Sequence, residues 1–172
     1  HVEFTGMGIA NNHKLLTVLN KDEMVGMRWL NDRTYRTYIT YKINDTELTV
    51  TIEKVKVDVK VVEEGTYPKF HIGLKLDAIV SDFNEEITKK DVVSTLEEAI
   101  RKEIEHTFKI GLERGVDVYR LSEVVYRYHN RLFKEIEQDG KVPFDENSIA
   151  SVTVDIERLS AGRKEFTKSI GD

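Results

Sequence analysis

The chain has 172 residues and a net charge of −5, and 40% of its residues are hydrophobic and 33% are charged. This length and composition suit one globular domain with a hydrophobic core, while the negative charge gives no overall attraction to nucleic acid or an anionic membrane. The chain contains no cysteine, which excludes disulfides, thiolate zinc sites and a cysteine nucleophile within this segment.

The first predicted elements are a β-hairpin and a short helix. Two apolar stretches, residues 2–10 and 15–19, flank a turn at residues 11–13, which is typical of a hairpin. Asn20 is a candidate N-cap with Glu23 at the third helical position. The helix after it is indicated by apolar residues at helical spacing, which are Met24, Met27 and Leu30.

Long alternating strands follow. Residues 35–43 alternate with period two, and residues 48–61 do so as well, but in the latter the apolar parity switches near Glu53 and Lys54. Because side chains alternate strictly along a strand, the switch predicts a β-bulge or a sharp coil, or a strand that passes between two packing surfaces. Residues 70–80 alternate again, and we expect them to pair with the preceding strand as an antiparallel hairpin.

A long amphipathic helix is predicted over residues 88–115. Its apolar stripe recurs every four residues and comprises Val92, Leu96, Ile100, Ile104 and Phe108. Thr88 and Asp91 have the spacing of a capping box, and Gly115 is suited to a left-handed C-terminal stop. A helix with one such stripe must bury it, and the strands before it are the obvious partner.

The last third of the chain predicts a second helix over residues 117–138 and a final strand over residues 149–158. The order of elements indicates an α+β fold, with an antiparallel sheet and both helices packed on one of its faces. We expect residues 1–162 to form a single domain and residues 163–172 to form a polar tail.

No arrangement of reactive side chains is apparent in the sequence. Glu103 and His106 have the spacing of half a di-iron site, but no second copy exists, and the simpler interpretation is an exposed helix surface. Adjacent glutamates fall in predicted turns or on a polar helix face, where solvated charge is expected. We therefore predict no catalytic residue, no metal site and no cofactor.

Three stretches together resemble the C-terminal domain of the Ger(x)C family, the lipoprotein C subunits of nutrient germinant receptors in spore-forming bacteria. The first comprises Phe4, Gly6, Leu15, Leu16, Glu23 and the run from Met27 to Asn31, and the second is the long helix followed by Gly115–Tyr119. The third runs from Tyr126 through Lys134 to the last strand and Gly162. Asn130 and Phe133 replace the proline and tryptophan of the family pattern, so we expect the second helix to continue unbroken.

The resemblance implies properties that the composition cannot. A signal peptide and a lipid-modified cysteine would lie upstream, and the lipid would hold the protein at the outer face of the spore inner membrane. The partners would be the integral membrane A and B subunits, and no nucleic acid would be bound. The role would be assembly or signalling in the germination response to nutrients, without catalysis.

Three hypotheses follow. The first is a non-enzymatic receptor subunit whose candidate interface anchors are Trp29, Tyr35 and Tyr38, because aromatic residues concentrate at binding hot spots. If Trp29 proved fully buried against the long helix, it would leave this set. The second hypothesis is a module that binds the nutrient itself, which requires a concave site with convergent polar groups. The third is a hydrolase, which requires paired titratable groups with displaced pKa values in a cleft.

Overall fold

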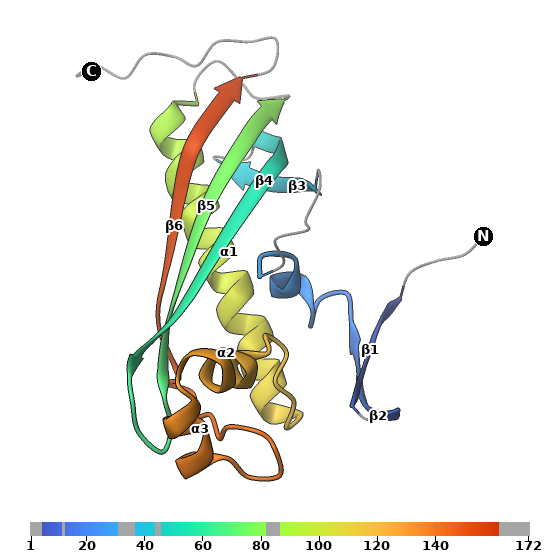
Figure 1. The fold of residues 1–172 in the computed structure, drawn as a ribbon. Helices are drawn as coiled ribbons and strands as arrows, with labels where there is room; N and C mark the ends of the chain where they lie inside the picture. Colours follow the sequence, from blue (N-terminus) through green and yellow to red (C-terminus); the bar gives the residue numbers. More distant parts are fainter. Residues whose placement is uncertain (1–4, 12, 31–36, 44–45, 82–86, 162–172) are drawn as a thin grey trace.

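The computed structural model describes residues 5–11, 13–30, 37–43, 46–81 and 87–161. Its elements in chain order are β1 (Gly6–Asn11), β2 (Lys14–Asn20), the 3-10 helix η1 (Val25–Arg28), β3 (Thr37–Ile43), β4 (Thr46–Glu63), β5 (Lys69–Ser81), α1 (Lys89–Glu113), α2 (Leu121–Tyr128), α3 (Asn130–Ile136) and β6 (Ile149–Ala161). One sheet has the order β3-β4-β5-β6, and β1 and β2 form a separate two-stranded sheet. In Figure 1, α1 runs along one face of the four-stranded sheet, and the β1–β2 hairpin stands apart from that sheet.

Helix α1 begins and ends as its sequence predicts. The Asp91 N–H donates to Thr88 Oγ1 (3.2 Å) and the Thr88 N–H donates to Asp91 Oδ2 (3.1 Å), which completes the capping box. At the other end Gly115 has a φ of 63°, and the Val116 N–H donates to the Gly111 carbonyl (2.9 Å). This is the Schellman arrangement, which satisfies carbonyls that the helix would otherwise leave open.

The predicted stripe of α1 is buried and forms the main core with the sheet. Four of its residues are at most 1% exposed, namely Val92, Leu96, Ile100 and Ile104. They belong to one apolar cluster with the inward side chains of the four strands. Burial of each such side chain stabilises the fold by about 1.5–3 kcal/mol relative to full exposure.

The predicted change of face within β4 is confirmed as a β-bulge. Ile52 pairs with Ala78 and Lys54 with Asp77, so Glu53 is the extra residue between them. Val50 and Ile52 are buried before the bulge, and Val55 is buried after it. The extra residue returns the apolar side chains to the α1 side of the sheet, where they can be buried.

The α+β class is confirmed, with one difference in the sheet. β3, β4 and β5 pair antiparallel, whereas β6 pairs parallel with β5. The three helices lie between β5 and β6 in the chain. Through them the chain returns to the end of the sheet at which β5 begins. A long crossover of this kind allows a parallel pair, which a short hairpin does not.

The prediction of one unbroken second helix is wrong. The segment forms α2 and α3, separated at His129, whose φ and ψ are −133° and 51°. Tyr128 is 73% exposed and Leu132 is 8% exposed. Residues four apart lie on the same face of a continuous helix, so the break is what allows Leu132 to be buried while Tyr128 remains in solvent.

A second core cluster joins these helices to the lower end of the sheet, and its buried members are Phe70, Phe108, Leu121, Val125, Leu132 and Val142. Tyr119 packs against both this cluster and the main one. The domain span of residues 1–162 stays a prediction, and the predicted tail lies outside the described residues.

Candidate functional site

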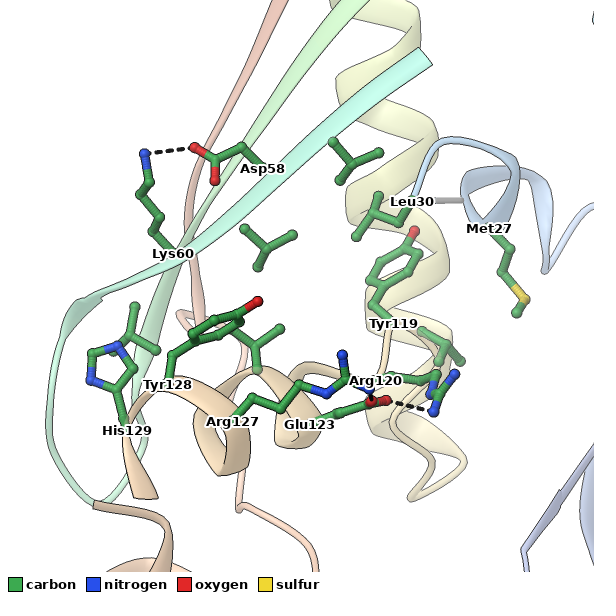
Figure 2. Close-up of a pocket in the computed structure, with 15 residues that line it drawn as sticks. Met27, Leu30, Asp58, Lys60, Tyr119, Arg120, Glu123, Arg127, Tyr128 and His129 are labelled. Atoms are coloured by element: carbon green, nitrogen blue, oxygen red, sulfur yellow. Dashed lines mark ion pairs between the residues drawn. The ribbon is translucent and has the colours of Figure 1, made fainter. Parts of the chain in front are cut away.

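An open edge of β4 borders the groove that we take as the candidate site. β3 pairs with β4 only along Thr46–Ile52, whereas β5 pairs with β4 as far as Glu63. In the described part of the chain, no strand pairs with the outer side of β4 at Asp58–Val62. A groove of about 1330 Å³ lies between this edge, α2 and η1. Figure 2 shows β4 on one side of the groove and α2 on the other.

The groove has an apolar floor. Val59 and Val61 of β4 are half-buried against the second core cluster, and Val124 of α2 packs against the same cluster. Leu30 and Tyr119 form the end near α1. The floor therefore suits apolar side chains of a bound molecule.

The rim of the groove is charged. Arg120 and Arg127 both form ion pairs with Glu123, the first at 2.5 Å, and the two arginine side chains are 79% and 62% exposed. On the opposite wall Lys60 pairs with Asp58 at 2.6 Å. The lining thus holds three full positive charges and two carboxylates, in a chain whose net charge is −5. The two guanidinium groups share one carboxylate, so a further anion is complementary to this rim.

Hydrogen bonds at the start of α2 fix the part of this helix that forms the charged rim. Asp117 accepts hydrogen bonds from the N–H groups of Leu121 (2.9 Å) and Ser122 (2.8 Å), which satisfies two donors in the first turn. Arg120 precedes the helix with a φ of 57°, a left-handed backbone that is uncommon for residues other than glycine.

A hydrogen-bond network beside the groove joins η1 to α1. The Gly26 N–H donates to Thr107 Oγ1 (2.9 Å), and Thr107 Oγ1 donates to the Glu23 carbonyl (3.0 Å). Asn20 and Glu23 form the predicted capping interactions, with the Glu23 N–H donating to Asn20 Oδ1 (3.0 Å) and the Asn20 N–H donating to Glu23 Oε2 (2.9 Å). The element after them is a four-residue 3-10 helix, shorter than the sequence suggests.

Trp29 leaves the set of interface anchors. Its side chain is 0% exposed, and its Nε1–H donates to Glu103 Oε2 on α1 at 2.7 Å. Burial raises the pKa of Glu103, and the hydrogen bond from Trp29 and the charge of Arg28 partly offset this effect. Burial also raises the pKa of Tyr41, whose hydroxyl donates to Glu103 Oε1 at 3.5 Å.

Of the other two predicted anchors, Tyr38 is described by the structure and does not line the groove. Tyr38 lies on β3 and is 68% exposed, so its interface role stays a prediction. Tyr35 lies outside the described residues. Glu103 accepts the hydrogen bond from Trp29, while His106 is exposed. Across the described ranges, no group of three or more His, Asp or Glu side chains could hold a metal ion.

Sequence reasoning did not identify Arg120, Arg127 or the open edge of β4. One signal was available, since the strand predicted over residues 35–43 is too short to cover the long alternating stretch at residues 48–61. A second signal was the spacing of Arg120 and Arg127 from Glu123, three and four residues within the helix predicted over residues 117–138, but the position of these residues beside β4 depends on the tertiary structure.

Comparison with known proteins identifies the family of this chain. The family described as spore germination B3/GerAC like, C-terminal, matches residues 5–160. The chain belongs to this family. The prediction made from the three sequence stretches is therefore confirmed.

One curated protein and one solved structure are similar over most of this chain. Spore germination protein KC of Bacillus subtilis (strain 168) is 22% identical over 146 residues, which are 80% of this chain and 35% of that protein. A crystal structure of the GerBC protein superposes with a TM-score of 0.73 and 19% identity, covering 92% of this chain and 51% of that one. The chain thus spans about a third to a half of these relatives, and the structural likeness supports the fold. None of the helices in the described residues is long and apolar enough to cross a membrane.

Proposed function

We propose that this chain is the C-terminal domain of the C subunit of a nutrient germinant receptor, and that it works by binding other receptor subunits rather than by catalysis. The observation that carries the proposal is the family match over residues 5–160. In the proposal, the partners are the integral membrane A and B subunits. A lipid anchor upstream holds the protein at the outer face of the spore inner membrane.

The groove supports a binding role. It combines an apolar floor, a charged rim and an open strand edge, which are features of a protein interface. The described groove residues include no nucleophile held by a base and no pair of carboxylates in contact, which acid–base or covalent chemistry would use.

A second candidate is direct binding of a nutrient, which the arginines of the rim favour for a ligand with a carboxylate. The groove exceeds the range of roughly 300–1,000 Å³ typical of small-molecule sites, so we place this candidate second. Calorimetric titration of the full-length protein with single amino acids and sugars would test it, and saturable heat that is lost in Arg127→Ala would favour it.

The receptor role is tested by deleting the gene in its source organism and following the release of dipicolinic acid after single nutrients are added to spores. We expect selective loss of the response to one nutrient, restored by the full-length gene. Unchanged responses to every nutrient, even in a strain that lacks its other germinant receptors, would contradict the proposal.

A further inference from the structure

We propose that the open edge of β4 at Asp58–Val62 binds an extended, acidic segment of another receptor subunit, which adds a fifth strand to the sheet. This inference rests on the proposed function and names the surface through which it acts. β4 is hydrogen-bonded to β5 on one side here, and no described strand occupies the other side. Exposed strand edges present backbone donors and acceptors to a further strand, a recurrent mode of peptide recognition.

The space beside the edge suits a strand. Five residues of a strand extend roughly 17 Å, and a paired strand lies about 4.8 Å away. The groove of about 1330 Å³ lies directly beside this edge, and α2 bounds it opposite. The apolar floor at Val59, Val61 and Val124 would receive every second side chain of the added strand, because successive side chains point to opposite faces.

The charged side chains along the groove indicate which kind of segment binds there. The side chains of the added strand that face α2 would lie over the apolar floor and near Arg120 and Arg127, and those on the opposite face would lie near Lys60 and Asp58, which pair with each other. The arginines share Glu123 as their partner, so an incoming carboxylate would meet a rim with more positive than negative charge. A strand whose α2-facing side chains are apolar over Val59 and Val61 and acidic beside the arginines is complementary to both features. A second copy of this chain would bring the same cationic rim against itself, which like charges disfavour.

The test uses the full-length protein, purified alone and in complex with the receptor subunits that co-purify with it from spores. Hydrogen–deuterium exchange of the peptide that contains residues 58–62 is compared between the two samples. We expect the amides of this peptide that point away from β5 to exchange at least tenfold more slowly in the complex, because pairing with an added strand protects them, whereas the amides that donate to β5 are already protected. Unchanged exchange in an intact complex would overturn the inference, since contacts made by side chains alone leave these amides exposed.

A charge-reversal pair tests the rim. We expect Arg120→Glu with Arg127→Glu to reduce co-purification of the partner subunits about tenfold or more. The matched control is Arg101→Glu with Lys109→Glu, which makes the same change in charge at exposed positions of α1 and should leave co-purification unchanged. If the charge reversal prevents folding, the neutral variant Arg127→Gln replaces it in the test. Folded variants that recover the partner subunits as well as wild type does would contradict the inference that the bound segment is acidic.

Other outcomes are separable. Slowed exchange at residues 58–62 in the protein alone, with dimers that form as concentration rises, would identify a second copy as the occupant and overturn the inference. A gene deletion without effect in a strain that lacks the other receptors would remove the proposed function itself. If the gene deletion abolishes a nutrient response and the complex is intact, but the amides of residues 58–62 are not protected in it, the proposed function stands and only the inference of an added strand is overturned.

Discussion

The indole of Trp29 donates a hydrogen bond of 2.7 Å to the carboxylate of Glu103, a residue 74 positions later in the chain. The Trp29 side chain is completely buried, and the Glu103 side chain is 20% exposed. The bond fixes the segment after η1 to the middle of α1. A buried tryptophan N–H needs such an acceptor, because an unsatisfied donor is costly in the core.

Substitution at Trp29 should be much more costly than substitution at its partner. We expect Trp29→Phe to lower the free energy of unfolding by about 2–4 kcal/mol, because it removes the donor and leaves space in the core. Glu103→Gln should cost at most about 1 kcal/mol, since the amide oxygen still accepts the hydrogen bond. Urea unfolding of both variants measures the difference, with Glu105→Gln on the exposed side of α1 as the control. Equal losses in the two variants would show that the charge of Glu103 matters more than its role as acceptor.

The raised pKa of Glu103 predicts a pH dependence of stability. An unfolded glutamate titrates near pH 4.3, whereas burial raises the pKa of Glu103 in the folded protein. Between these two values the folded state holds a proton that the unfolded chain has released, so this contribution to stability decreases as pH rises. The difference in unfolding free energy between wild type and Glu103→Gln should therefore fall as pH increases above 4.

Glu98 provides a control of opposite sign on the same helix. Its hydrogen bond from Lys102 lowers its pKa, so the stability that it contributes is lost as pH falls through that lowered value. The difference between wild type and Glu98→Gln should rise slightly with pH, as followed by urea unfolding across pH 3–7. The same trend in both variants would contradict the environment described for Glu103.

Gly26 is required by the close approach of η1 to α1. A Cβ atom at this position would overlap Tyr119 Oη and the backbone carbonyl oxygen of Glu103. We expect Gly26→Ala to destabilise the protein by about 1–3 kcal/mol, because the backbone oxygen cannot move without disturbing α1. Gly65→Ala is the matched control, since its Cβ would have no neighbour within 4 Å. Thermal unfolding compares the two, and an unchanged midpoint for Gly26→Ala would mean that η1 is not held against α1 in solution.

Tyr38 is the remaining aromatic candidate for an interface anchor. It is 68% exposed on β3, so Tyr38→Ser should change the free energy of unfolding by less than about 0.5 kcal/mol. We expect the same variant of the full-length protein to recover less of the partner subunits from spores. Tyr67→Ser, at a position that is 50% exposed in the turn between β4 and β5, should recover them as wild type does. Equal recovery with both variants would remove Tyr38 from the interface.

Local patterns in the sequence determined the ends of α1, its buried stripe and the bulge in β4. Each depends on residues only a few positions apart: Thr88 with Asp91, Gly115 with Gly111, and the change of parity around Glu53. Caps, helical period and strand alternation act over one or two turns or a few strand residues, so they can be read without knowledge of the rest of the fold.

Only the tertiary structure decided the burial of Trp29, the parallel pairing of β6 and the break at His129. Each depends on which distant segment arrives alongside, and the sequence does not encode that choice in any local pattern. The candidate site is of this kind. Its walls come from β4, η1 and α2, and they form a groove because β3 pairs with only the first part of β4.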